Sequence, residues 1–559
     1  MKEENFRPEG GTERGRKHRM TETGRPSLSD AAGMLLFFLA AVMAVYSLTL
    51  CTSTDIWYDE LFTMGLTEQT VGRLLALAAE DVHPPLYYLI VKAVTELVHL
   101  FVPGLDAVII AKAISVLPYL GLLGYAAVPV RKRDGWLCAG LFAFCLLSMP
   151  QLSNYTTEVR MYGWALFFVT AAFLHVREIL ISGKRLHWAA FWFYGVCAAY
   201  SHYFAAVSAV CLYAALALLL WWKQKKGGDE KLQGSRPFGW LKGLGPWFVC
   251  VVLSVLIYLP WLPSAISQVS AVREDYWILP LTLSCFGGCV KFVLKPSTGY
   301  QLPDYVLAVL LSACLLFFLL RAFFSRKRNG VEWAGAVYAS CGIWVLAGTA
   351  LFGIAVSFLM RPVFVYRYML PALGGFWYCF AFFASGSGTA SGRAQEKQVK
   401  RRGADPGKRI CQILPLVLLI GVGLVDYRSF VQGEQLKGEQ MQRTLQAFAG
   451  LEEDSVILFN FDQVQAVAGY YLDRETWLYG DEPETLIVEM FPDVKAAGNA
   501  EWVKSLLEEG RTVWFVGSNL AREAVLEEWD ELGIVPDRVV DSLLLERYWF
   551  NLYHLSLNS

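Results

Sequence analysis

The chain has 559 residues, of which 55% are hydrophobic, 14% aromatic and only 18% charged. A soluble domain is usually about half apolar and about a quarter charged, so this composition excludes an ordinary soluble globular protein. The formal net charge of -1 gives no general affinity for nucleic acid. The 12 cysteines contain no Cys-x-x-Cys pair, so they indicate neither a disulfide framework nor a zinc site.

The excess of apolar residues is concentrated in long runs. Several of these runs reach or approach the roughly 20 residues that a helix needs to cross the hydrocarbon core of a membrane. We therefore expect a polytopic α-helical membrane protein with about 11 to 13 transmembrane helices. The first run is longer than the apolar region of a signal peptide, so it is expected to remain as the first membrane helix. The clearest runs are residues 31–50, 164–174, 204–222, 247–261, 306–320 and 410–425.

Clusters of lysine and arginine predict the topology, because cytoplasmic loops carry an excess of these residues. Residues 1–30 form a basic tail that we expect to be disordered and cytoplasmic, which places the next loop, residues 51–83, outside. The resulting alternation puts the stretches around Glu158, His202 and Arg367 outside, together with the C-terminal region. Further inside loops are marked by basic residues at positions 131–133, 184–185, 223–226, 326–328 and 400–402.

One stretch leaves this topology open. Between His83 (outside) and Arg131 (inside) the chain must cross the membrane an odd number of times, yet the sequence there indicates two helices broken near Pro103-Gly104. Either one of the two helices does not span the membrane, or the Arg131 cluster is an exception to the rule.

From about residue 428 onward the pattern changes. Residues 455–460 and 512–517 are short apolar runs that end in turn signals, as buried strands do. Residues 501–509 and 521–532 are amphipathic and predict helices. Alternation of strands and helices predicts a small α/β domain over residues 428–559, on the outer face. Residues 385–409 are expected to form a solvated inside loop.

The first outside loop concentrates acidic residues at the membrane surface. It carries Trp57-Tyr58-Asp59-Glu60 and then Asp81-Val82-His83-Pro84-Pro85, which leads into the next helix. Acids in such a place are costly unless they are used. The plain alternative is that the acids are solvated and that the two prolines simply begin a helix at its first turn.

Three later segments, all predicted to lie outside, carry further polar landmarks: residues 153–162 with Glu158, Arg160 and Tyr162; residues 200–204 with His202; and residues 366–372 with Tyr366 and Arg367. In this order, the four segments resemble the GT-C glycosyltransferases. The similarity is greatest to the branch that contains the protein O-mannosyltransferases and the bacterial aminoarabinose transferases of lipid A. The resemblance covers most of residues 31–427, which it identifies as a GT-C-like transmembrane catalytic domain.

The resemblance implies an enzyme that moves a sugar from a polyprenyl-phosphate carrier to an acceptor hydroxyl, with inversion at the anomeric carbon. It implies Asp59 as the base that takes the acceptor proton, with Glu60 as a supporting neighbour. Arg160 and Arg367 are the candidates that bind the donor phosphate, because a guanidinium pairs bidentately with phosphate oxygens. The alternative for both arginines is interfacial snorkelling at helix ends.

The remaining landmarks are candidates for substrate or metal binding. They are Asp81, His83, Glu158, Tyr162, His202 and Tyr366. No cofactor is certain, and a divalent cation held by Asp59, Asp81 and His83 stays open. The sequence has the Asp-x-His arrangement of the O-mannosyltransferases, whereas the aminoarabinose transferases carry Glu-Lys before the two prolines. This difference argues against the same metal site as in the aminoarabinose transferases.

Two other classes of function compete with a transferase. A lipid or glycan transporter would show broken helices, internal repeats and charges deep in its membrane spans, but these spans are nearly free of charge. A membrane-anchored binding protein would leave the ordered motifs unexplained. We therefore expect a transferase of the bacterial plasma membrane with its active site on the outer face. Its partners would be the lipid-linked donor, membrane lipid and an unidentified glycan, lipid or protein acceptor.

Overall fold

The computed structural model describes residues 27–226, 244–272, 278, 280–325, 333–386, 406–472, 474–518 and 521–558. Most of the predicted cytoplasmic tail, the basic clusters at 326–328 and 400–402, and most of the predicted loop 385–409 lie outside the described residues.

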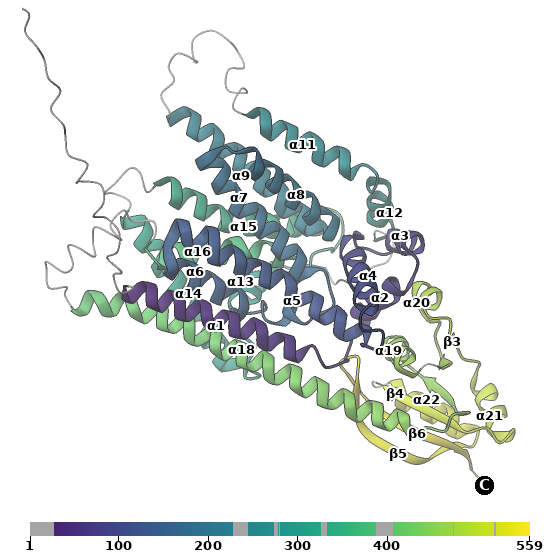
Figure 1. The fold of residues 1–559 in the computed structure, drawn as a ribbon. Helices are drawn as coiled ribbons and strands as arrows, with labels where there is room; N and C mark the ends of the chain where they lie inside the picture. Colours follow the sequence, from purple (N-terminus) through teal and green to yellow (C-terminus); the bar gives the residue numbers. More distant parts are fainter. Residues whose placement is uncertain are drawn as a thin grey trace, which may run out of the picture.

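Apolar helices form the main body of the protein, which is an elongated bundle with a smaller mixed domain at one end (Figure 1). We call the end that carries the mixed domain the domain end. The opposite end, where Arg133 and Lys184 lie, is called the basic end. The bundle helices are α1 (Leu28–Leu50), α5 (Ala107–Tyr125), α6 (Arg131–Ser148), α7 (Tyr162–Ser182), α8 (Arg185–Ser201), α9 (Tyr203–Lys226), α11 (Gly245–Tyr258), α14 (Gln301–Ser325), α15 (Trp333–Leu359), α16 (Leu373–Ala384) and α18 (Pro406–Ala449).

These helices make the protein a multi-pass membrane protein, as the composition predicted. Among the described residues, seven helices are long and apolar enough to cross a membrane, or eight if the bent pair of α11 and α12 (Leu262–Val272) counts as one span. Shorter helices such as α8 and α16 lie in the same bundle, so length and composition undercount its members. By length and composition, the described residues therefore hold seven or eight membrane-spanning helices, fewer than the 11 to 13 that the sequence predicted.

Short helices at the domain end resolve the open question about the stretch between His83 and Arg131. Helices α2 (Tyr58–Glu68), α3 (Val71–Glu80) and α4 (Leu86–His99) gather there beside the mixed domain (Figure 1). In α4, Lys92 Nζ donates to the carbonyl oxygen of Thr67 at 3.3 Å, which keeps this helix against the end of α2. Helix α4 has 14 residues and is not among the helices long enough to span the membrane, so α5 makes one crossing here, in agreement with the odd number that the basic residues require.

A reversal follows at the basic end. The π-helical turn Ala126–Val130 continues α5, and Gly135 within the following helix has φ 84°, a conformation that side-chain-bearing residues rarely adopt. After Gly135 the chain returns along α1. A Cβ atom on Gly140 would lie 2.0 Å from the carbonyl oxygen of Gly33, so these two helices are in backbone contact. Such close approach of small residues is a common way to pack membrane helices.

Some segments between the other bundle helices lie at the domain end, whereas Gly183 and Lys184, between α7 and α8, lie at the basic end. Helix α13 (Cys285–Leu294) precedes α14, and the 3-10 segments Asn154–Thr156 and Tyr366–Ala372 precede α7 and α16. These segments carry the motifs that the sequence singled out, and the fold brings all of them to the same end of the bundle.

Helix α18 links the bundle to the C-terminal domain. It runs beside α1 and continues past the bundle into the domain (Figure 1), so it is continuous across the predicted boundary at residues 427–428. The domain has a six-stranded sheet in the order β3-β2-β1-β4-β6-β5, parallel from β3 to β4 and antiparallel over β6 and β5. Its strands are β1 (Val456–Phe459), β2 (Thr476–Leu478), β3 (Val494–Ala496), β4 (Val513–Ser518), β5 (Ile534–Leu545) and β6 (Tyr548–Leu557).

The helices of the domain are α19 (Asp462–Leu472), α20 (Thr485–Met490), α21 (Ala500–Glu508) and α22 (Ala521–Glu531). The two predicted strands and two predicted helices are confirmed as β1, β4, α21 and α22. Helices α19 and α20 pack on α2 of the membrane half, where the side chains of Met490 and Phe491 lie against Gly65. The domain is therefore fixed on the first loop, next to Asp59.

Candidate active site

The two adjacent acids at the start of α2 have different surroundings. Glu60 is 5% exposed and its carboxylate accepts hydrogen bonds from the backbone N–H groups of Val159 at 2.6 Å and Trp57 at 3.1 Å. Burial raises the pKa of Glu60. Thr63 adds a hydroxyl bond to the Val159 carbonyl at 3.0 Å. Glu60 thus ties the segment before α7 to α2, and its oxygens are occupied.

Asp59 lies between the two predicted arginines. Arg160 Nη1 donates to the Asp59 carbonyl oxygen at 2.6 Å. Arg367 Nη2 lies 3.1 Å from Asp59 Oδ2, in an ion pair that lacks hydrogen-bond geometry, so Oδ2 has no hydrogen-bond partner. Arg160 is 4% exposed and bonds the backbone, whereas the Arg367 and Asp59 side chains are 20% and 25% exposed. The fold brings all three residues together, with Arg367 as the arginine that faces open space.

A second polar group lies beside this pair. His83 Nδ1 is 3.4 Å from Asp81 Oδ2, and the Tyr88 hydroxyl donates to the same oxygen at 3.3 Å. The rings of His83 and His202 are 5.6 Å apart. Burial lowers the pKa of His83. His202 Nδ1 accepts from the backbone N–H of Phe204 at 3.0 Å. Both imidazoles are therefore expected to be neutral. The Nδ1 atom of His83 is already engaged by Asp81, and that of His202 by the backbone of Phe204.

The arrangement does not fit a bound metal ion. Asp81 is engaged by His83 and Tyr88, and Asp59 is engaged by Arg367. Over the described ranges, no group of three or more His, Cys, Asp or Glu side chains could hold a metal ion. Among the described residues, Asp59, Asp81 and His83 are therefore not gathered as a set of metal ligands.

The three remaining predicted residues lie in different places. Glu158 faces a cavity, and burial, with repulsion from Glu60, raises its pKa to about 7. The centre of the Tyr162 ring lies 5.8 Å from the guanidinium of Arg367, so Tyr162 lies beside the pair of Asp59 and Arg367. Tyr366 is directed away from it. Its ring covers Gly288 of α13, where an added Cβ would meet the tyrosine hydroxyl at 2.2 Å. Tyr366 thus belongs to the packing of α13.

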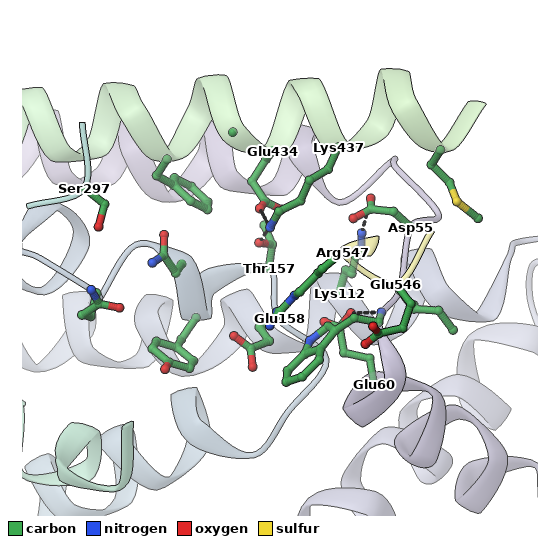
Figure 2. A pocket seen from close by; sticks show the side chains of 18 of the residues that line it. Asp55, Glu60, Lys112, Thr157, Glu158, Ser297, Glu434, Lys437, Glu546 and Arg547 are labelled. Carbon is green, nitrogen blue, oxygen red and sulfur yellow. Dashed lines mark hydrogen bonds and ion pairs between the residues drawn. The ribbon is translucent and has the colours of Figure 1, made fainter. Parts of the chain in front are cut away.

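A cavity of about 450 Å³ lies between the bundle and the C-terminal domain (Figure 2). This volume is in the usual range for small-molecule sites. Its wall is formed by the first loop, the segment before α7, helix α18 and the turn between β5 and β6. Asp59 does not line the cavity itself but pairs with Arg367, which does. Its charged lining residues are Asp55, Glu60, Lys112, Glu158, Arg367, Asp426, Glu434, Lys437, Glu546 and Arg547.

Several of these lining residues were missed by the sequence analysis. Lys112 is a lone lysine in the apolar α5 and pairs with Asp55 at 2.8 Å, so an isolated charge in a membrane helix was the available signal. Lys437 pairs with Glu434 at 2.5 Å on the exposed continuation of α18. Arg547 lies on a turn that contains no Gly, Pro, Asn or Asp, and no sequence signal pointed to it.

The fold and this cavity define a polytopic membrane protein with a polar site at the end of its bundle, beneath a small α/β domain. No protein-family model matches the sequence, and a search of curated proteins finds no significant match. The structure is similar to that of ArnT from Cupriavidus metallidurans. The structure of ArnT with undecaprenyl phosphate bound matches this chain with a TM-score of 0.52 and a sequence identity of 13%. The match covers 95% of this chain and 98% of ArnT.

The apo structure of ArnT gives 13% identity and a TM-score of 0.51 over 94% and 98% of the two chains. The archaeal oligosaccharyltransferase AglB from Archaeoglobus fulgidus is more distant, at 10% identity and a TM-score of 0.42, over 88% of this chain and 70% of AglB. The likeness to ArnT extends over nearly the whole of both chains. The protein therefore has the GT-C fold, as the sequence motifs predicted.

Proposed function

We propose that the protein is a membrane glycosyltransferase that moves a sugar from a polyprenyl-phosphate carrier to an acceptor hydroxyl. The observation that carries this proposal is the ion pair of Asp59 and Arg367 at the margin of the cavity. It joins the two groups such a reaction needs: a carboxylate base and a fixed cation for the leaving phosphate. The fold shared with ArnT, which was solved with undecaprenyl phosphate bound, supports the choice of donor.

In the proposed reaction, the acceptor hydroxyl gives its proton to the Asp59 carboxylate as its oxygen attacks the anomeric carbon. The bond from that carbon to the phosphate oxygen breaks, and its electron pair leaves with the phosphate. Attack opposite the leaving group inverts the anomeric centre. A phosphate that binds Arg367 competes with Asp59 for the guanidinium, so donor binding would release the carboxylate to act as the base. Arg160 holds the backbone of Asp59 in place.

The basic residues support a site on the outer face of the membrane. Arg133 and Lys184 lie at the end of the bundle away from the cavity. Since cytoplasmic loops carry the excess of lysine and arginine, the cavity and the C-terminal domain would face outward. A lipid-linked donor there keeps its chain in the bilayer and presents its phosphate near Arg367.

The test is sugar transfer by the purified full-length protein in detergent. It is supplied with a panel of polyprenyl-phosphate sugars and a membrane extract as the source of acceptor, and release of polyprenyl phosphate is measured. Asp59→Asn should lower the rate about 10²- to 10⁴-fold, the usual contribution of a general base.

Asp106→Asn is the matched control, because Asp106 caps α5 by accepting from Val108 N–H at 2.7 Å, and asparagine caps equally well. Equal rates for wild type and Asp59→Asn would refute the role of Asp59. Transport of an intact lipid-linked sugar across sealed vesicles that contain the protein, without release of lipid phosphate, would replace the transferase by a transporter.

A further inference from the structure

The turn between β5 and β6 places two charged residues in an unusual backbone conformation. Leu545 pairs with Tyr548, so Glu546 and Arg547 alone form the turn, with φ values of 49° and 66°. A two-residue turn with positive φ at both positions favours Asn-Gly and similar pairs. Side chains in this region of backbone space are uncommon and gather at functional sites. Glu546 and Arg547 are therefore candidates for a functional role.

Glu546 fixes the turn on the first loop of the membrane half. It is 4% exposed, and its Oε1 accepts from the backbone N–H of Tyr58 at 3.1 Å, one residue before Asp59. The ring of Tyr548 packs edge-on against Phe461 at 4.7 Å, which supports the turn from the domain side. The tip of the hairpin is therefore held against the same helical turn that carries the proposed base.

Arg547 extends from this tip into the cavity (Figure 2). Its guanidinium lies 3.6 Å from the centre of the Trp57 ring, and the guanidinium of Arg367 lies 5.7 Å from the same ring. Stacking on an indole holds a guanidinium flat and leaves its N–H groups at the edge available to an anion.

Arg547 forms no close ion pair with the described part of the chain, although its charge acts at longer range on Glu158 and Glu546. Three other cations line the cavity, and each has a carboxylate close by: Arg367 has Asp59 at 3.1 Å, Lys112 has Asp55 at 2.8 Å, and Lys437 has Glu434 at 2.5 Å. Arg547 has no carboxylate within 4.0 Å and makes no hydrogen bond through its guanidinium to any part of the chain that the structure describes. An arginine that stacks on a ring in a cavity and has unused donors is suited to bind an anion through charge-assisted hydrogen bonds.

We propose that Arg547 binds the phosphate of the lipid carrier, so that the C-terminal domain supplies part of the donor site. This inference rests on the proposed function and adds a residue to it. Arg367 is already partly neutralised by Asp59, so Arg547 would be a second cation, beside Arg367, that meets the charge that grows on the phosphate as the sugar departs. A phosphate between the two arginines would lie beside the Trp57 ring, next to the base.

The test is binding of undecaprenyl phosphate to the purified full-length protein in detergent, measured by titration for wild type, Arg547→Gln and Arg547→Lys. Loss of one bidentate, charge-assisted contact should weaken binding roughly 10- to 100-fold for Arg547→Gln. Arg547→Lys keeps the charge without the planar fork and should fall between the two. The uncharged alcohol undecaprenol should bind all three proteins equally.

Arg538→Gln is the matched control. Arg538 is on β5 of the same hairpin and also stacks on a tryptophan, with its guanidinium 4.6 Å from the Trp514 ring, but it lies outside the cavity lining. Its affinity for undecaprenyl phosphate should equal that of wild type. Unchanged affinity in Arg547→Gln, or equal loss of undecaprenol and undecaprenyl phosphate, would overturn the proposal. A third outcome concerns inorganic phosphate. If Arg547→Gln loses affinity for inorganic phosphate but keeps wild-type affinity for undecaprenyl phosphate, the site binds free phosphate, and the proposal is also overturned.

The binding measurement separates this inference from the proposed function. If Arg547→Gln binds undecaprenyl phosphate less tightly while wild type transfers no sugar, the anion site stands and the transferase fails. If wild type transfers sugar and Arg547→Gln binds and reacts like wild type, the transferase stands and the anion site fails. If wild type does not bind undecaprenyl phosphate, both are overturned.

Discussion

Replacement of Glu60 by alanine tests whether the two adjacent acids of the first loop have different tasks. The carboxylate of Glu60 accepts the buried N–H of Val159 at 2.6 Å and the N–H of Trp57 at 3.1 Å. Alanine leaves both donors without an acceptor. A buried donor that loses its partner costs about 1–3 kcal/mol, so the loss of both acceptors in Glu60→Ala should destabilise the protein by about 2–6 kcal/mol.

Asp59→Asn should behave in the opposite way. It keeps the shape of the side chain and weakens an ion pair whose members are 20% and 25% exposed, which is expected to cost about 1 kcal/mol or less. Glu60→Gln retains an amide oxygen as acceptor and should be intermediate between wild type and Glu60→Ala in stability.

The assay is thermal unfolding in detergent, followed by tryptophan fluorescence, together with the rate of sugar transfer at a temperature where every variant is folded. We expect Glu60→Ala to unfold at a clearly lower temperature, and Asp59→Asn to unfold like wild type and to be inactive. A Glu60→Ala protein with wild-type stability and no transfer would refute the reasoning, because Glu60 would then be a reacting group. Equal destabilisation by Glu60→Ala and Asp59→Asn would also refute it.

Three further predictions concern the surroundings of the site. Lys112→Met leaves Asp55, whose side chain is 20% exposed, without its charged hydrogen-bond donor, so it should cost about 1.5–3 kcal/mol in thermal unfolding. A second change, Asp55→Asn, should restore part of this loss, and simple addition of the two effects would contradict the pairing. Glu158 has its pKa raised to about 7, so the folded state binds more protons than the unfolded state, and stability should fall as pH rises from about 4.5 to 7. Glu158→Gln should flatten that pH profile and stabilise the protein at pH 8 by at most about 3 kcal/mol, whereas an unchanged profile would count against it. Gly140→Leu should prevent assembly of the bundle, since its Cβ would meet the backbone of α1 at 2.0 Å, while Gly421→Ala, with no atom within 4 Å, should give wild-type yields of monodisperse protein.

The sequence by itself determined the class of the protein and the main parts of its fold. A long apolar run is stable only in lipid or inside a bundle, and there its backbone groups must bond within a helix. Each run therefore predicts a helix from its own residues alone. The alternation of basic clusters required an odd number of crossings between His83 and Arg131, and α5 makes one. The short apolar runs of β1 and β4 are local signals too, because a buried strand is recognisable from its own residues.

The ordered motifs also predicted that the candidate site residues share one end of the bundle. Asp59, Arg160 and Arg367 are far apart in the chain, yet their predicted side of the membrane was the same, and the structure joins them. What a motif does not encode is which neighbour each side chain has. Asp59 and Glu60 are adjacent acids that the sequence does not distinguish. They differ because the backbone N–H of Val159, 99 residues away in the chain, donates a hydrogen bond to the carboxylate of Glu60.

The contribution of the C-terminal domain to the cavity was decided by tertiary structure alone. The turn of Glu546 and Arg547 lacks the glycine or asparagine that marks a two-residue hairpin, so the sequence showed neither the turn nor the two strands beside it. Its place beside Trp57 depends on how the domain docks on α2. Docking is set by contacts between residues hundreds of positions apart, such as Glu546 with Tyr58, and no local pattern records them.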